Sequence, residues 1–441
     1  MALQLSSLQR PSVEQPEVAR VIAYEKTLGG GFGFFTESFT YRQLLASDGR
    51  RDFPHFWFYS LLAAPGVAFA RATGLNPVVG FVLANTTLFL VALAVAAPRV
   101  GWPASLLLFL GPVVWWIDKV HTEVFTFSLL AVGVTLVADA PWWSMVAFGA
   151  AATQNLPIAI AIPLVGVIAA VSRPDHLRDR RFWLGAAAGL GLVAMHALYY
   201  LARLGVPEPQ MLVGGVSAHV PRVTEMGAFV WDPNIGILPN FPALAPVVLA
   251  GAMMVAARRR WRALEPGVIV AGVLAVLLLA VFAQTPNVNS GGTPGPARYG
   301  LWLIPLAIPI LAAAEQHGGA TWRRGIAAVA LASCVWALVT YHPRRPESYL
   351  EPTMLAAYLW DRHPAFDRPL PEVFAERVTG TDIFTPFEPV ATASCSKVLL
   401  VEGRWPGRCP STDVPSACVT AGEYCYANRR VDGSYGFSWA R

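Results

Sequence analysis

The sequence predicts an all-α, polytopic membrane protein that ends in a small α+β domain. Hydrophobic residues make up 55% of the 441 residues and charged residues only 14%, whereas about 25% of the residues in soluble globular proteins are charged. Apolar runs of about 20 residues, long enough for a helix to cross the hydrocarbon core, recur between residues 78 and 341. Beyond them lies a polar tail that contains four of the five cysteines.

Basic connections between the apolar runs predict the orientation of the chain. Arginines cluster at residues 173–181, 258–262 and 323–324. Because short cytoplasmic loops of membrane proteins are rich in Lys and Arg, we expect these connections inside. We therefore attribute the net charge of +5 to arginines that orient the chain in the membrane, and no nucleic-acid partner is expected. Counting short broken helices, we expect about 9 to 11 membrane helices, with spans near residues 78–97, 102–117, 119–138, 183–203, 242–257, 266–283, 298–314 and 326–341.

Two stretches depart from a simple span. The run "PWWSMVAFGAAATQNLPIAIAIPLVGVIAAV" must return to the inside before Arg173. We expect two short helices broken at "TQNLP", because irregular backbone at membrane depth needs protein or a watery cavity around it. Residues 1–54 form a polar segment with no spanning run. The next segment, "FWFYSLLAAPGVAFA", is either a short span or an interfacial segment, and the second case requires a helix upstream of the printed sequence.

Three regions are therefore expected: residues 1–54, a membrane domain at 55–342 and a tail at 343–441. The tail has strand-like pieces such as "KVLLVEG" and a hairpin signal in "VDGSYGF". Its cysteines are Cys395, Cys409, Cys418 and Cys425. Clustered cysteines outside the membrane predict two disulfides and an extracytoplasmic tail. Zinc binding is the weaker alternative, because no CxxC spacing occurs.

The stretch "WWIDKVHTEVFTFSLL" places four ionisable groups inside an apolar region: Asp118, Lys119, His121 and Glu123. On a helix, Asp118 would neighbour His121, and Lys119 would neighbour Glu123. Ionisable groups at membrane depth cost several kcal/mol unless they are paired or solvated, which makes them functional candidates. The alternative is an interfacial turn with mutually neutralising, snorkelling charges.

Three further polar stretches are expected on the same outer side. They supply, in chain order, Asp48, Asp52 and His55, then Asp232 and Asn234, then Arg298 and Tyr299. Each stretch has a structural explanation, namely turn chemistry for "DPN" and "GGTPGP" and interfacial anchoring for the Arg and Tyr. Together they predict a cavity that handles a phosphate and hydroxyl groups, since a carboxylate can accept a hydroxyl proton and a cation can hold a phosphate.

Several common sites are missing from the sequence. There is no GxxxxGK[ST] or GxGxxG phosphate loop, no HExxH and no GxSxG. Energy coupling by ATP and zinc proteolysis are therefore disfavoured. No cofactor is assigned; His121 and the neighbouring carboxylates carry donor atoms for a divalent metal, but their spacing is not diagnostic.

The chain resembles the GT-C superfamily of membrane glycosyltransferases, which use sugars linked to a polyprenyl phosphate. The resemblance extends over residues 37 to 342. It rests on "DFPHFWFYSLLAAPGVAF", "IDKVHTEVFTFSLL", "AATQNLP", "DPNIGILPNFP" and "GGTPGPARYGLW". It implies an enzyme in a bacterial inner membrane that transfers a hexose or pentose from this lipid-linked donor to an extracytoplasmic glycan, lipid or protein.

The resemblance also implies roles for individual residues. One catalytic acid belongs in the first outer loop, where Glu37 and Asp52 are the available residues, and Asp118 or Glu123 matches a second position. The helix that precedes this loop in the superfamily is not in the printed sequence. The groups expected to bind substrate are Lys119, His121, His55, Asp232, Asn234, Arg298 and Tyr299.

Two other classes of function stay open. A transporter or lipid flippase would have polar groups near mid-membrane and an inverted repeat of broken helices. The sequence predicts only one broken segment, which favours the glycosyltransferase. An inactive scaffold with a partner-binding tail is the third reading.

Overall fold

The computed structural model describes residues 44–50, 52–53, 55–213, 215, 219–257, 265–285, 288, 295–345, 347–383, 386, 388–420 and 424–439. The chain divides into two compact units. Unit 1 contains residues 1–215, 243–278 and 302–346, and unit 2 contains residues 216–242, 279–301 and 347–441. Glu37 lies outside the described residues.

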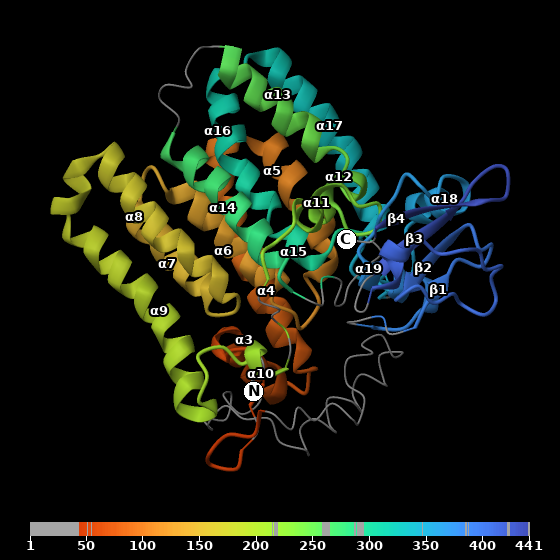
Figure 1. Cartoon of the computed structure of the whole chain (residues 1–441). Helices are drawn as coiled ribbons and strands as arrows, with labels where there is room; N and C mark the ends of the chain where they lie inside the picture. Colours follow the sequence, from red (N-terminus) through yellow and green to blue (C-terminus); the bar gives the residue numbers. More distant parts are fainter. Residues whose placement is uncertain are drawn as a thin grey trace. The chain divides into compact units, whose positions relative to one another are not determined.

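Unit 1 is built from helices (Figure 1). Its first half comprises α3 (Phe58–Ala72), α4 (Val78–Val100), α5 (Trp102–Phe109), the 3₁₀ helix η2 (Pro112–Trp116), α6 (Glu123–Leu136), α7 (Pro141–Ala152), η3 (Leu156–Ile160), α8 (Ala161–Ser172), η4 (Pro174–Arg178), α9 (Arg180–Leu204) and α10 (Gln210–Val213). Its second half comprises α13 (Leu244–Ala257), most of α14 (Pro266–Phe282), η6 (Ile304–Ala307), α16 (Ile308–His317) and α17 (Ala320–Thr340).

Glycines allow two pairs of helices in unit 1 to approach closely. Helix α4 packs against α3, and α7 packs against α9. A Cβ atom on Gly80 would lie 2.3 Å from the main-chain nitrogen of Val67, and one on Gly149 would lie 2.5 Å from the carbonyl oxygen of Gly189. Small residues at such crossings let backbones meet, which is the usual way in which membrane helices pack.

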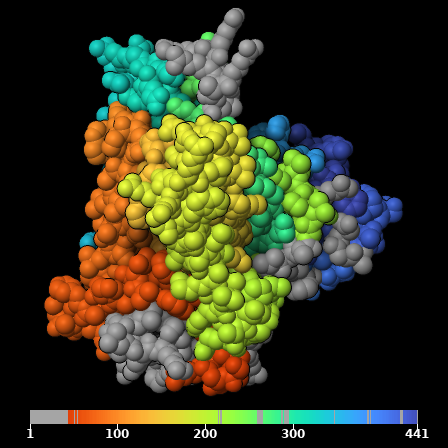
Figure 2. All heavy atoms as spheres, turned by 90° about the vertical axis from the view of Figure 1, so that its left-hand side faces the viewer, coloured from red at the N-terminus to blue at the C-terminus, as the bar shows by residue number. Residues whose placement is uncertain are grey.

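Four helices among the described residues are long and apolar enough to cross a membrane, judged by length and composition: Val78–Val100, Arg180–Leu204, Arg298–His317 and Ala320–Thr340. Four shorter apolar helices accompany them, at Glu123–Leu136, Leu156–Ser172, Leu244–Ala257 and Pro266–Phe282. Figure 2 shows the face of unit 1 that α8 and α9 cover, in yellow and yellow-green. Helix α9 exposes large apolar side chains such as Leu184, Leu190 and Leu198, as a lipid-facing helix does.

Two breaks that the sequence did not predict interrupt expected spans. The span at 102–117 ends as an α-helix at Phe109, and η2 begins at Pro112. The span at 298–314 is divided into α15 (Arg298–Leu301), η6 and α16, with Pro305 in η6 and Pro309 at the start of α16. Proline lacks the amide hydrogen that continues a helix, which explains both breaks. Residues 102–117 are therefore not one continuous helix, whereas Arg298–His317, with its 3₁₀ turn, is still long and apolar enough to cross a membrane. The break at "TQNLP" is confirmed, because α7 ends at Ala152 and η3 begins at Leu156.

Unit 2 contains a small antiparallel sheet flanked by helices (Figure 1), which confirms the α+β prediction for the tail. The strand order is β1-β2-β3-β4, and Leu399 pairs with Tyr426 across the two central strands. The elements of this unit are α11 (Val223–Trp231), α12 (Ile237–Asn240), α15, α18 (Met354–Arg362), α19 (Pro371–Thr379), β1 (Val390–Ala391), β2 (Lys397–Val401), η7 (Ser416–Val419), β3 (Tyr424–Arg429) and β4 (Tyr435–Trp439).

All five residues of β2 are buried, so both faces of this strand pack against other parts of unit 2. Leu399 joins a cluster with Trp360 of α18 and Phe374 of α19. On the other face, Val398 and Leu400 pack in a cluster that contains Cys409, Cys418 and Cys425. Strand residues alternate between faces, and here one face is covered by helices and the other by disulfides.

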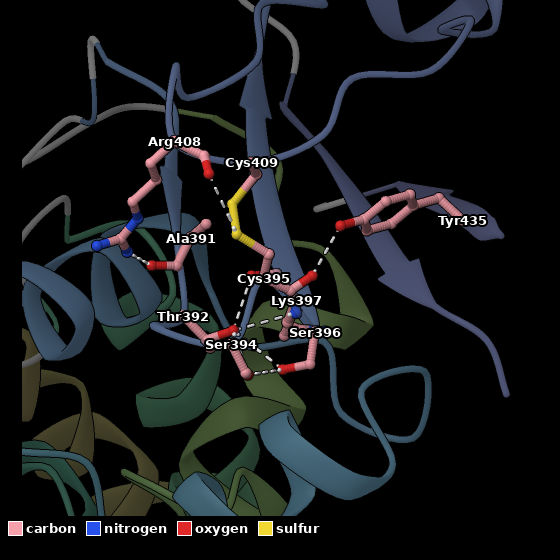
Figure 3. Close-up of a disulfide and its surroundings, with 9 residues drawn as sticks. All are labelled: Ala391, Thr392, Ser394, Cys395, Ser396, Lys397, Arg408, Cys409 and Tyr435. Carbon is pink, nitrogen blue, oxygen red and sulfur yellow. Dashed lines mark hydrogen bonds between the residues drawn. A yellow bond between two sulfur atoms is a disulfide. The ribbon is translucent and has the colours of Figure 1, made fainter. Parts of the chain in front are cut away.

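The tail cysteines form two disulfides, as predicted. Cys395 bonds to Cys409, and Cys418 bonds to Cys425. Around the first bond, the Tyr435 hydroxyl donates to the carbonyl of Cys395 at 2.9 Å, and the Arg408 guanidinium donates to the carbonyl of Ala391 (Figure 3). The disulfide and these two hydrogen bonds together hold the segment around Arg408 and Cys409 to the sheet.

Candidate functional site

The ionisable groups of residues 118–123 lie at a turn in unit 1. Residues 117–122 are not helical, and α6 begins only at Glu123. Lys119 Nζ lies 2.6 Å from Asp118 Oδ1, and His121 Nδ1 lies 3.7 Å from Glu123 Oε2. The predicted pairing of Asp118 with His121 and of Lys119 with Glu123 is wrong, because helical spacing does not apply to residues in a turn.

The two acids of this turn differ in accessibility. The Asp118 side chain is 36% exposed, whereas that of Glu123 is 2% exposed. The His121 ring, 23% exposed, packs edge-on against Trp116 with ring centroids 5.2 Å apart. Asp118 is therefore accessible, while Glu123 faces the interior.

Lys119 is held by the backbone of a distant segment. Its ammonium donates to the carbonyl of Pro343 at 2.6 Å and lies 4.6 Å from the centre of the Trp115 ring. The Trp115 indole donates to the carbonyl of Arg345 at 2.9 Å. Two neighbouring side chains before α6 thus bind the segment that follows α17.

Asn85 of α4 holds the turn through hydrogen bonds to its backbone. Its amide donates to the carbonyls of Ile117 and Lys119 at 3.3 and 3.0 Å, and its oxygen accepts from the Tyr59 hydroxyl at 2.9 Å. Asn85 is fully buried. Because buried polar groups are costly without partners, this network determines the conformation of the turn and therefore the position of Asp118.

Asp52, the other acid assigned to the first outer loop, lies in a separate cluster of unit 1. It is 4% exposed. Its carboxylate accepts from Arg203 Nε at 2.5 Å and from the Tyr199 hydroxyl at 2.9 Å, both on α9. Arg203 also binds Asp48 at 2.9 Å. These contacts hold Asp48 and Asp52 to the end of α9. His55 is half-buried and packs against Phe53.

Asp232 and Asn234 shape a turn within unit 2. The Asp232 carboxylate accepts from the main-chain nitrogens of Asn234 and Ile235 at 2.7 and 3.1 Å. Asn234 Oδ1 accepts from the main-chain nitrogen of Thr353 at 3.3 Å, and the Thr353 hydroxyl donates to the carbonyl of Pro233 at 2.8 Å. These contacts agree with the turn chemistry that the sequence offered as the alternative to substrate binding.

Burial near a second acid makes Asp232 unusual. Desolvation, followed by the negative charge of Asp367, raises the pKa of Asp232 to about 7. Burial raises the pKa of Asp367 as well. The Arg377 guanidinium nearby acts in the opposite direction on Asp232, but burial lowers its own pKa to about 10.

Arg298 and Tyr299 also lie in unit 2, where α15 begins. Arg298 Nη2 donates to the Tyr299 hydroxyl at 3.1 Å, and the guanidinium carbon lies 5.0 Å from the centre of that ring. Tyr299 stacks on Phe282 with ring centroids 5.0 Å apart. An aromatic platform therefore orients the guanidinium, an arrangement compatible with anchoring and with phosphate binding.

The predicted site residues thus form separate groups. Residues 118–123 lie together, Asp48 and Asp52 meet on Arg203, and the groups of unit 2 are described above. One cavity that unites residues of both units stays a prediction. Sequence reasoning missed Asn85, Tyr59 and Arg203, because single polar residues in apolar runs carry no local signal. Within the described part of the chain, no three His, Cys, Asp or Glu side chains are grouped to hold a metal ion.

Comparisons with known proteins give one similarity. No protein-family model matches the sequence, and no curated protein matches it. Among solved structures, the chain is similar to ArnT from Cupriavidus metallidurans, crystallised with undecaprenyl phosphate, at 17% sequence identity and a TM-score of 0.39. The match covers 66% of this chain and 56% of the length of ArnT.

Proposed function

We propose that the chain is an integral membrane glycosyltransferase that moves a hexose or pentose from a polyprenyl-phosphate donor to an extracytoplasmic glycan, lipid or protein. The observation that carries the proposal is the turn at 117–122, which presents one accessible carboxylate, Asp118, beside a lysine. Buried hydrogen bonds from Asn85 hold that turn in place. The superfamily resemblance of the same stretch supports the assignment.

Asp118 would act as the base. Its carboxylate accepts the proton of the acceptor hydroxyl, whose oxygen forms a bond to the anomeric carbon of the sugar. The bond between that carbon and the phosphate oxygen breaks, and polyprenyl phosphate leaves as the anion. Lys119, beside Asp118, supplies positive charge for the departing phosphate. Glu123 and His121 would position the turn from the interior.

The outer side of a bacterial inner membrane is the proposed location of the tail. Two disulfides require an oxidising compartment in most organisms. The arginine-rich connections then lie in the cytoplasm, in agreement with the positive-inside tendency.

The decisive experiment compares Asp118→Asn with Asp139→Asn in cells that lack the native gene. Asp139 is a matched control, since it is 57% exposed and paired with Arg99 at 2.8 Å, just beyond α6. Transfer of labelled sugar from polyprenyl-phosphate hexose and pentose donors is measured in membranes. We expect Asp118→Asn to lose about 100-fold or more of the activity, at normal abundance, and Asp139→Asn to lose none. Full activity of both Asp118→Asn and Glu123→Gln would contradict the site.

A lipid flippase is the second candidate, because the structure contains a second broken segment. Helices α15, η6 and α16 interrupt the span at 298–317, in addition to the break between α7 and η3. Broken helices in both halves are typical of transporters. Reconstitution into vesicles separates the candidates: a flippase moves a fluorescent polyprenyl-phosphate sugar between leaflets without an acceptor, whereas a transferase consumes the donor only when an acceptor is present.

A further inference from the structure

A cavity of about 390 Å³ opens on the surface of the tail domain in unit 2. One wall comprises the last residue of α18 and the segment that follows it, up to Arg368, and the other is the hairpin of β3 and β4. Its volume lies in the range of about 300 to 1,000 Å³ that is usual for small-molecule sites. We call it the arginine pocket; its lining residues are Arg362, His363, Pro364, Ala365, Phe366, Arg368, Asn428, Arg429, Arg430, Val431, Gly436, Phe437 and Ser438.

The pocket is strongly basic. Four arginines and one histidine line it, and the described lining residues include no carboxylate. Two acids lie next to the pocket in the sequence: Asp361 pairs with the lining Arg362 at 3.4 Å, and the buried Asp367 carboxylate accepts from the Trp360 indole at 2.5 Å. The other three arginines therefore carry most of the free positive charge. Asp432 caps the main chain of Ser434 in the hairpin turn. Guanidinium groups are charged at any physiological pH and match the oxygens of phosphates in pairs.

An aromatic surface lies beside the arginines. Phe366 is 85% exposed, so most of its ring is accessible to a ligand. It meets the ring of His363 edge-on, with centroids 5.9 Å apart. A half-buried phenylalanine, Phe437, lines the opposite wall. Aromatic side chains present large apolar faces, and such faces suit the apolar face of a sugar ring.

A buried lysine fixes the two walls relative to each other. Lys397 Nζ donates to the carbonyls of Pro364 and Asp367 at 2.7 and 2.6 Å in one wall, and to Asn428 Oδ1 at 2.9 Å in the other. Asn428 Nδ2 continues the connection to the Ser438 hydroxyl at 3.2 Å. All three ammonium hydrogens are therefore used, and the pocket is formed before any ligand arrives.

Gly436 in the hairpin has no side chain, which leaves room for the guanidinium group of Arg430. A Cβ atom on Gly436 would lie 3.0 Å from Arg430 Nε and 3.2 Å from Nη2. The Arg430 guanidinium therefore lies across the backbone of Gly436, at the edge of the pocket. Gly433, at φ +84°, makes the turn that places the two residues opposite each other.

We propose that the arginine pocket binds a phosphorylated sugar, with the phosphate on the guanidinium groups and the ring against Phe366. The proposal rests on the tail alone and does not depend on the proposed function. A phosphate of this kind is carried by a glycan or by a lipid headgroup, and the experiment separates these two sources.

Binding is measured by isothermal titration calorimetry on the full chain in neutral detergent, with mannose 6-phosphate, inorganic phosphate and mannose as probes. We expect mannose 6-phosphate to bind, inorganic phosphate to bind more weakly and mannose not to bind. The double variant Arg429→Gln, Arg430→Gln should weaken the sugar phosphate about tenfold or more. Phe366→Ala should weaken the sugar phosphate but not inorganic phosphate.

Arg404→Gln is the matched control, since Arg404 is an exposed tail arginine outside the pocket, paired with Glu388 at 3.4 Å. Arg404→Gln should leave the binding of mannose 6-phosphate and of inorganic phosphate unchanged. In phosphatidylcholine nanodiscs, addition of phosphatidylglycerol tests the lipid source: competition that the double variant abolishes assigns the pocket to lipid headgroups, and its absence assigns it to glycans. No binding of either phosphate, or equal losses in Arg404→Gln and the double variant at unchanged thermal midpoints, would overturn the proposal.

Discussion

Lys119 and Pro343 are joined by a hydrogen bond of 2.6 Å although 224 positions separate them in the sequence. The same ammonium binds Asp118, so one lysine couples the candidate base to the segment at which α17 gives way to the tail. Trp115 also binds this segment, because its indole donates a hydrogen bond to the carbonyl of Arg345. The position of Asp118 therefore depends on where this distant segment lies.

Replacing Lys119 by methionine should reduce both stability and activity. The change removes two hydrogen bonds from a largely buried ammonium, and a bond to a charged group contributes about 1.5 to 3 kcal/mol. We expect a lower thermal midpoint and a lower kcat, because the Pro343 carbonyl loses its partner and Asp118 loses its fixed position. Intrinsic fluorescence during heating and the sugar-transfer assay measure the two effects. An unchanged kcat would show that Lys119 does not position Asp118.

The Asp52 and Arg203 pair should behave as a structural unit. Asp52→Asn removes the charge opposite Arg203 Nε, and we expect a loss of about 2 to 4 kcal/mol in the free energy of unfolding. Because Asp48 also binds Arg203, the loss should stay below that of a wholly buried pair. The double variant Asp52→Asn, Arg203→Gln should cost less than the sum of the single changes. Strict additivity would mean that the pair is not coupled.

Asp232→Asn should stabilise the protein by an amount that grows with pH. The folded-state pKa of Asp232 is about 7, above the value near 4 expected in the unfolded chain. Between these values the folded state binds more protons than the unfolded state, so the contribution of Asp232 to stability falls as pH rises. Asparagine stays neutral and its Oδ1 can still accept the hydrogen bonds of the turn.

The measurement is the difference in unfolding free energy between Asp232→Asn and the wild type at several pH values. It should be near zero at pH 4 and reach about 1 to 3 kcal/mol above pH 7. Asp139→Asn, at an exposed position, should show no such trend. A difference that is constant with pH would indicate an effect on hydrogen bonding rather than on ionisation.

Removing one disulfide should loosen the tail without disturbing unit 1. For Cys395→Ala with Cys409→Ala, the released loop spans 14 residues, for which the loss of stability is about 3 kcal/mol. Limited proteolysis should then cut the tail sooner, while the apolar helices stay protected. Mass spectrometry of unreduced peptides should find the pairs Cys395–Cys409 and Cys418–Cys425 in the wild type, and alkylation should label Cys334 alone. Alkylation of tail cysteines in unreduced protein would contradict the observed pairing.

The sequence predicted features that depend on local signals. Proline and polar residues predicted the break at "TQNLP", alternating residues and a glycine turn predicted the hairpin near residue 433, and clustered cysteines predicted disulfides. The pairing within residues 118–123 was predicted wrongly because helical spacing was assumed from Asp118 onward, whereas α6 begins only at Glu123. Arg203 was missed because only folding brings Asp52 to it. The hydrogen bonds of Lys397 to residues 364, 367 and 428 could not be predicted, because only tertiary packing brings these residues together.

The order of the strands in the tail has a consequence for its biogenesis. In the sheet β1-β2-β3-β4 each strand pairs with its successor, and each disulfide joins cysteines that are consecutive in the sequence. Contacts between near neighbours close quickly because little chain entropy is lost. If the tail enters an oxidising compartment from its N-terminal side, as the proposed location requires, the first two cysteines to arrive are the first correct pair. Vectorial oxidation therefore gives the native linkages directly, and the tail should mature without a disulfide isomerase.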